Sequence, residues 1–301
     1  VDADFTLVSS VETLQLSDNI QGVTMSVLAE AAGVVTVDGS ALTAGQTLTL
    51  AAGGYVTAGL TVLGGADNDT ITTGGGNDTI TAGLGSNVIT TNAGTDTINV
   101  GSATDNVSAG AGDDTVNITN ALFAVGLTVD GGANTDKIVV TTAATVVDAD
   151  FTNITTVETL ELGDFNAQSV TVGAAFADNS TLATIDADAL TGTNTVSVDA
   201  TGFTNALTIL TGAGADTVIG GTGVNTITTN GGADTITAGN VADVITTGAG
   251  ADTVNVTDAL FAGTLTVAGG TETDKIVVTD AATIVDADFT LVSGVETLQL
   301  S

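Results

Sequence analysis

Residues 72–100 read TTGGGNDTITAGLGSNVITTNAGTDTINV, and this stretch decides the fold. Glycines, an aspartate or asparagine, and an apolar residue return every nine positions. Asp78, Asn87 and Asp96 hold the acidic or amide position, and an isoleucine follows each of them two residues later. Like charges repel, so a regular spacing of carboxylates needs a physical reason.

The nonapeptide recurs in two runs, with six copies in the first and five in the second. Each copy divides into a Gly-rich turn of about six residues and a strand of about three, in which β-branched residues alternate with threonine. The repeated position is occupied by Asp69, Asp78, Asn87, Asp96, Asp105 and Asp114, and then by Asp216, Asn225, Asp234, Asp243 and Asp252.

A longer repeat contains the short one. The motif VDADF occurs at 1–5, 147–151 and 285–289, and each copy is followed by V-E-T-L at 11–14, 157–160 or 295–298. We therefore expect two long units and the opening of a third, cut from a longer tandem array. The expected segments are calcium-poor β segments at 1–63 and 147–210, β-rolls with a closing coil at 64–146 and 211–284, and the start of a third unit at 285–301.

Composition limits the partners of the chain. Its 301 residues include 35 acidic and 2 basic residues, a net charge of −33, and no His or Cys. Such a charge argues against nucleic acid and anionic membranes and favours cations. The missing residue types remove thiolate chemistry and the usual zinc ligand and general base. No apolar run approaches ~18 residues, so we expect no membrane span, and no basic-plus-apolar leader is visible.

Two successive nonapeptides make one coil of two strands and two turns. Parallel coils stack ~4.8 Å apart, so residues that are two nonapeptides apart lie above one another. This predicts an all-β, elongated parallel β-solenoid with a thin core, in which one side chain per nonapeptide points inward. The predicted inward columns are Ile71, Ile89 and Val107 on one side and Ile80, Ile98 and Val116 on the other.

The same stacking explains the carboxylates. Two of them ~5 Å apart repel by about 3 kcal/mol at an effective dielectric of 20. Calcium binds oxygen at about 2.3–2.6 Å, so two oxygens on opposite sides of one ion span ~4.8 Å, which is the coil spacing. We therefore expect several Ca²⁺ ions between coils, with main-chain carbonyls of the turns completing the oxygen shell.

The segment Thr73–Thr81 (TGGGNDTIT) resembles the RTX calcium-binding nonapeptide, G-G-x-G-x-D-x-U-x. The resemblance implies a parallel β-roll, Ca²⁺ in the turns, type I secretion and folding outside the cell. This chain departs from the pattern at the first glycine, which is mostly Thr, Ala or Val, and at Asn87 and Asn225. More weakly, the stretches around V-E-T-L are similar to repetitive bacterial S-layer and giant surface proteins.

The predicted metal ligands form two columns. The all-aspartate column is Asp78, Asp96 and Asp114, matched by Asp216, Asp234 and Asp252; the mixed column is Asp69, Asn87 and Asp105, matched by Asn225 and Asp243. Because asparagine is neutral, we expect the all-aspartate column to bind calcium more tightly. The expected carbonyl donors include Gly74, Gly76, Gly83, Gly85, Gly110, Gly112, Gly212, Gly214, Gly248 and Gly250.

Two further motifs leave alternatives open. Asp136 and Asp274 lie in echoes of the nonapeptide that follow Asp114 and Asp252 at a wider interval. Each echo is either a wider coil that closes the ladder, with Lys137 or Lys275 replacing one ion's charge, or a turn with a solvated lysine. The D-x-D pairs of VDADF are either metal ligands or solvated acids beside an anchoring phenylalanine, and the phenylalanine of A-L-F-A is expected in the core.

The function expected from these features is structural. We expect a secreted bacterial cell-surface protein, as an S-layer, filament or adhesin stalk, that self-associates and is folded and stiffened by Ca²⁺. The alternatives are an ice- or carbohydrate-binding adhesin module, or the C-terminal region of a larger RTX enzyme. Nothing in this chain predicts catalysis, since G-x-S-x-G and H-E-x-x-H are absent from it.

Overall fold

The computed structural model describes residues 2–18, 22–124, 126–173 and 181–301, and these form a parallel β-solenoid. The fold class predicted from the sequence is therefore confirmed. Val1, which opens the first VDADF motif, lies outside the described residues. None of the described helices is both long and apolar enough to span a membrane. The helical segments are η1 (Asp2–Phe5), α1 (Val27–Ala32), η2 (Asp148–Phe151), α3 (Asp258–Phe261) and η3 (Asp286–Phe289).

The contacts divide the chain into two units. Unit 1 is Val1–Val139 with Asp150–Glu158, and unit 2 is Val140–Ala149 with Thr159–Ser301. Each unit contains one complete run of nonapeptides together with longer coils. The division into five segments by calcium content stays a prediction.

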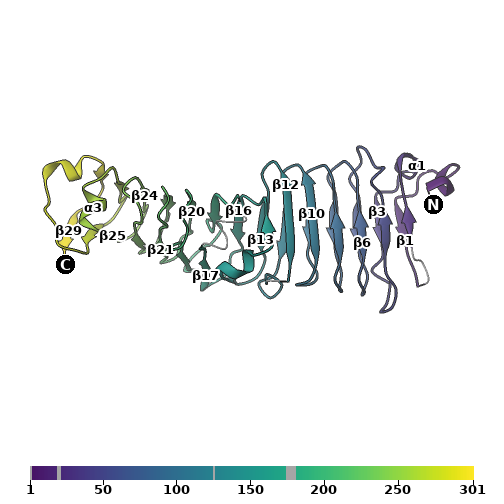
Figure 1. Ribbon diagram of the computed structural model, residues 1–301, viewed down its shortest axis with the longest axis horizontal. Helices are drawn as coiled ribbons and strands as arrows, with labels where there is room; N and C mark the ends of the chain where they lie inside the picture. The colour runs from purple at the N-terminus through teal and green to yellow at the C-terminus, as the bar shows by residue number, and fades with distance from the viewer. Residues whose placement is uncertain (1, 19–21, 125, 174–180) are drawn as a thin grey trace. The chain divides into compact units, whose positions relative to one another are not determined.

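In unit 1 each coil gives one strand to each of two sheets, and successive strands lie side by side as rungs (Figure 1). One sheet has the order β1 (Thr13–Gln15), β3 (Thr36–Asp38), β5 (Thr61–Leu63), β7 (Thr79–Thr81), β9 (Thr97–Asn99), β11 (Thr115–Ile118) and β13 (Lys137–Val140). The other has the order β2 (Val23–Thr24), β4 (Thr49–Ala51), β6 (Thr70–Thr72), β8 (Val88–Thr90), β10 (Asn106–Ala111), β12 (Thr128–Ala133) and β15 (Ile154–Thr155).

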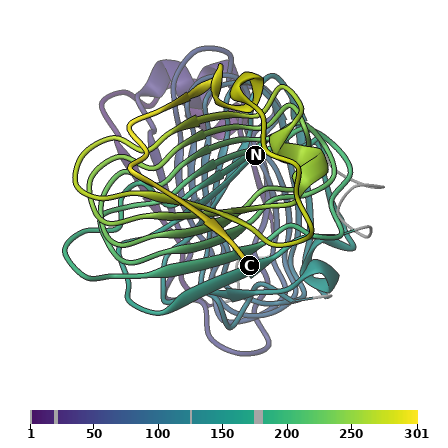
Figure 2. The same ribbon diagram turned by 90° about the vertical axis from the view of Figure 1, so that its left-hand side faces the viewer.

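Unit 2 repeats this design, and Figure 2 shows its coils in green to yellow as loops stacked one behind another. One sheet has the order β16 (Thr159–Leu162), β18 (Thr184–Asp186), β20 (Thr208–Leu210), β22 (Thr226–Thr228), β24 (Val244–Thr246), β26 (Thr266–Ala268) and β28 (Val292–Ser293). The other has the order β14 (Thr145–Val146), β17 (Gln168–Thr171), β19 (Val196–Asp199), β21 (Thr217–Ile219), β23 (Thr235–Thr237), β25 (Thr253–Val256), β27 (Lys275–Val278) and β29 (Thr297–Leu300).

Coil length changes where the nonapeptides end. In the first run Ile71 pairs with Ile89, and Ile89 pairs with Val107, so each coil has the predicted length of two nonapeptides. The next steps in this sheet, from Val107 to Val129 and from Val129 to Ile154, are both longer. The additional residues enlarge the turns while the strands keep their pairing.

The core follows the predicted inward columns. Ile71, Ile89 and Val107 stack through β6, β8 and β10 and are at most 1% exposed. The opposite column, Ile80, Ile98 and Val116, stacks through β7, β9 and β11 and is also buried. Because each strand alternates its side chains, the flanking threonines point away from this core.

The longer coils accommodate larger side chains. Phe123 of A-L-F-A and Phe151 of VDADF meet edge to face with ring centroids 5.1 Å apart, and both are buried. Phe261 and Phe289 repeat the contact at 5.5 Å, although Phe289 is 41% exposed. The core positions expected for Phe123 and Phe261 are therefore confirmed.

Candidate metal centre

The aspartates of the all-aspartate column form a ladder of hydrogen bonds along the stack. The backbone N–H of Asp78 donates to Oδ1 of Asp96 at 2.7 Å, and that of Asp96 donates to Oδ1 of Asp114 at 2.7 Å. In unit 2, Asp216 donates to Asp234 and Asp234 to Asp252, both at 2.8 Å. Each carboxylate is therefore held in the interval between two successive coils.

The ladder continues beyond the nonapeptides. The N–H of Asp114 donates to Asp136 Oδ1 at 2.8 Å, and that of Asp252 donates to Asp274 Oδ1 at 2.9 Å. Of the two readings open at the sequence level, the structure shows the wider coil that carries the column onward. Lys137 stands at the start of β13, next to this aspartate.

Two glutamates close the ladder, and the sequence analysis did not single them out as ligands. The N–H of Asp136 donates to Glu158 Oε2 at 2.7 Å, and that of Asp274 donates to Glu296 Oε2 at 2.8 Å. Both are the glutamate of a V-E-T-L motif, and each follows its aspartate by the same interval that separates Asp114 from Asp136. That repeated interval was the available signal.

The second oxygen of each of these aspartates is buried without a hydrogen-bond partner among the described residues. A buried carboxylate oxygen that lacks a partner is strongly unfavourable, so the arrangement calls for a cation at this place. The atoms concerned are Oδ2 of Asp78, Asp96, Asp114, Asp136, Asp216, Asp234, Asp252 and Asp274, and each of these residues is at most 2% exposed.

Burial also alters the acidity of these groups. Removal from water raises the pKa of Asp78 and Asp136 to about 6. For the same leading reason it raises the pKa of Asp114 and Asp234 to about 7. The neighbouring carboxylates of the column add a smaller effect in the same direction, as Asp96 does to Asp114. A cation bound to the column would favour the ionised form.

In the mixed column, backbone N–H groups of the turn bind the second oxygen of the aspartates Asp105 and Asp243. Oδ2 of Asp105 accepts the backbone N–H groups of Gly101 and Ser102, both at 3.0 Å. Oδ2 of Asp243 accepts those of Gly239 and Asn240 at 3.0 and 2.9 Å. These carboxylates are neutralised in part by the dipoles of their own turns, as in an anion-binding nest.

The asparagines of the mixed column do not behave alike. The side-chain amide of Asn225 donates to the carbonyls of Gly221 and Gly223, both at 2.9 Å, and to Asp243 Oδ1 at 3.1 Å. The amide N–H groups of Asn225 thus occupy carbonyl and carboxylate oxygens that could otherwise bind a cation. Asn87 accepts the N–H of Asp69 through Oδ1, but its amide nitrogen has no partner among the described residues.

Glycine turns bring main-chain carbonyls close to the all-aspartate column. A methyl group placed on Gly94 would lie 2.1 Å from the carbonyl oxygen of Gly76, and Gly94 has φ +139°. Only glycine permits both the backbone angle and the approach. Of the predicted carbonyl donors, Gly83 and Gly85 belong to the mixed column and all the others to turns of the all-aspartate column.

The donor set fits a hard cation. Throughout residues 2–18, 22–124, 126–173 and 181–301, no three acidic side chains converge into a metal cage of their own. An ion in an interval of the column would therefore take carboxylate oxygens from neighbouring coils and complete its shell with carbonyls or water. Six to eight oxygens without nitrogen or sulfur are what calcium binds.

Comparison with known families agrees with this geometry. The RTX calcium-binding nonapeptide repeat matches the chain in four copies, at residues 61–89, 81–116, 210–244 and 228–256. Neither a curated protein nor a solved structure matches the chain. The matched segments contain both runs of nonapeptides and end before Asp136 and Asp274.

Proposed function

We propose that this chain, which carries two runs of RTX calcium-binding nonapeptide repeats, is a structural protein whose solenoid is folded and stiffened by Ca²⁺ in the all-aspartate column. The observation that carries the proposal is the set of buried Oδ2 atoms without a partner among the described residues. A divalent ion between successive carboxylates replaces their repulsion by attraction. The mixed column contributes less, because its turns already satisfy most of its oxygens.

Secretion belongs to the same proposal. RTX repeats typify extracellular proteins that are exported by type I systems. Calcium is scarce inside the cell and plentiful outside it. A net charge of −33 keeps the metal-free chain open during export, and external calcium then allows the coils to stack. We place the protein at a bacterial cell surface, as a subunit of an S-layer or filament or as an adhesin stalk, where it associates with further copies.

The direct test is far-UV circular dichroism of the full chain during a calcium titration, with reversal by EGTA. We expect little β structure without calcium, at least across residues 64–117 and 211–255, and a cooperative gain with it. Magnesium serves as the matched control, since it demands a smaller octahedral site and gives up its water reluctantly. A chain equally folded in EGTA and in millimolar calcium would refute the proposal.

A further inference from the structure

We propose that Asp136 with Glu158, and Asp274 with Glu296, form additional calcium sites outside the nonapeptides. The inference rests on the proposed function, because it extends the same ladder by one coil in each unit. The residues of each pair lie within one unit. The glutamates lie beyond every segment that the RTX repeat matches.

The first support is the continuity of the ladder. Each hydrogen bond from an aspartate N–H to the next carboxylate measures 2.7–2.9 Å, both within the nonapeptides and in the two later steps. The interval that holds Asp136 and Glu158 is therefore built like those between the repeat aspartates. The longer glutamate side chain reaches the position that an aspartate occupies one coil earlier.

The second support is a buried oxygen that has no partner. Oδ2 of Asp136 and Oδ2 of Asp274 lack a hydrogen bond among the described residues, and each residue is only 2% exposed. Neither atom can be satisfied by bulk water. A cation between this oxygen and the glutamate of the next coil would satisfy both charges.

The third support is the close approach of a main-chain carbonyl to these oxygens. A methyl group on Gly131 would lie 2.7 Å from Asp136 Oδ2 and 2.1 Å from the carbonyl oxygen of Thr156. On Gly269 the corresponding distances, to Asp274 Oδ2 and the carbonyl oxygen of Gly294, are 2.7 and 2.0 Å. Each glycine thus lets a carboxylate oxygen and a main-chain carbonyl oxygen approach one point, a cradle that any side chain at this position would fill.

The two units build this cradle from different residues with the same backbone. Thr156 and Gly294 occupy equivalent positions and both have a positive φ, 50° and 61°. Asn134 and Glu272 are likewise equivalent, with φ of 86° and 77°. Non-glycine residues adopt this region at a cost, so its recurrence indicates that the turn geometry is selected.

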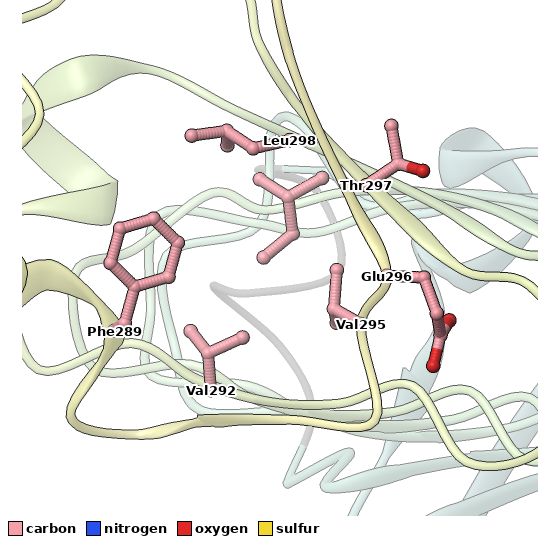
Figure 3. Close-up of a pocket in the computed structure, with 7 residues that line it drawn as sticks. Phe289, Val292, Val295, Glu296, Thr297 and Leu298 are labelled. Carbon is pink, nitrogen blue, oxygen red and sulfur yellow. The ribbon is translucent and has the colours of Figure 1, made fainter.

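The carboxylate of Glu296 is directed to the ladder rather than to the apolar side chains of its neighbours. Phe289, Val292, Val295 and Leu298 line a pocket together with Glu296, whose carboxylate end is turned away from Phe289 and Val292 (Figure 3). The carboxylate meets the N–H of Asp274 instead. V-E-T-L therefore joins an apolar contact to a ladder carboxylate, and calcium at this point would tie the wider coils to the repeat.

The test uses the full chain with Glu158→Gln and Glu296→Gln together. Glutamine can still accept the aspartate N–H, so the fold is kept while the negative charge is lost. Equilibrium dialysis with radioactive calcium measures ions bound per chain, and circular dichroism in saturating calcium checks the β content. We expect one ion fewer per substituted site at limiting calcium, with affinity at these sites lower by about tenfold or more.

Glu12→Gln is the matched control, because it alters the same V-E-T-L motif outside both ladders and should leave calcium binding unchanged. Asp136→Asn with Asp274→Asn provides a second variant, which should lose the same ions and also those of the preceding intervals, because each of these aspartates borders two intervals. Unchanged stoichiometry and affinity in the glutamine and asparagine variants would overturn this inference and leave the proposed function standing. A parent chain that binds no calcium would overturn both.

Discussion

The same substitution, aspartate to asparagine, should affect the calcium dependence of stability in the all-aspartate column but not in the mixed column. Asp96→Asn removes a charge from a carboxylate whose Oδ2 is buried without a partner among the described residues, between the coils of Asp78 and Asp114. Asp105→Asn removes a charge from a carboxylate whose Oδ2 is bound by two backbone N–H groups. Both residues are fully buried, so the comparison holds side-chain type and burial constant.

The magnitude follows from linkage between folding and calcium. Each ion that binds only the folded chain adds about 1.4 kcal/mol to the free energy of unfolding per tenfold rise in calcium above its dissociation constant. Asp96 borders two intervals of the column, so losing both ions lowers this dependence by about 2.8 kcal/mol per decade of calcium. Asp105→Asn should cost roughly 1.5–3 kcal/mol for the lost charged hydrogen bonds at every calcium concentration.

Urea unfolding of both variants and the parent, followed by circular dichroism at several calcium concentrations, measures this dependence directly. We expect a shallower calcium dependence for Asp96→Asn and an unchanged one, displaced to lower stability, for Asp105→Asn. Equal calcium dependences in the two variants would refute the assignment of calcium to the all-aspartate column. A loss confined to Asp105→Asn would place the ions in the mixed column instead.

Three further predictions test the coil itself. Burial raises the pKa of carboxylates such as Asp114 to about 7, so the metal-free folded chain is favoured below pH ~4 and loses that stability as the pH rises toward 7. Circular dichroism of calcium-stripped protein should therefore show more β structure at pH 4 than at pH 7.5. Equal spectra at the two pH values would contradict this prediction. Gly94→Ala should destabilise the calcium-loaded protein by more than the roughly 1–3 kcal/mol of backbone strain, because the added methyl group also meets the carbonyl of the neighbouring coil. Gly53→Ala, whose methyl group meets nothing nearer than 3.9 Å, should not cause such a loss. Similar thermal midpoints for the two variants would argue against close stacking of the turns. Thr91→Val removes the buried hydrogen bond from Thr91 Oγ1 to the Ala109 carbonyl at 2.6 Å and should lower the free energy of unfolding in urea by about 1–3 kcal/mol. Thr79→Val on the exposed face should change it by no more than about 0.5 kcal/mol. Equal losses in the two variants would show that this hydrogen bond does not contribute the stability.

Much of the solenoid could be predicted from periodicity. A nonapeptide with one isoleucine and one aspartate specifies a strand, a turn and half of a coil, and the pairs Ile71–Ile89 and Ile80–Ile98 lie where the spacing put them. Strand alternation alone assigns isoleucine to the core and its threonine neighbours to the outside. Local chemistry and a fixed repeat length were sufficient for this part.

The longer coils could not be predicted in the same way. The steps from β10 to β12 and from β12 to β15 are longer than two nonapeptides and differ from each other, so the nine-residue period does not mark them. Their register is set by which apolar side chains can stack, such as Phe123 against Phe151, and that contact joins residues far apart in the sequence. Sequence reasoning therefore identified Asp136 and Asp274 as candidates but missed Glu158 and Glu296, whose place depends on this register.

The sequence by itself determined the architecture, the identity of the carboxylate columns and the preference for a hard cation. These follow from the repeat, because residues that stack on one another lie a fixed number of positions apart in the sequence. Only the tertiary structure decided how the two columns differ. Whether the second oxygen of an aspartate meets backbone N–H groups, as at Asp105, or none among the described residues, as at Asp96, depends on how each turn folds back over it. That orientation is a property of stacked coils, since each turn is shaped by the coil beneath it.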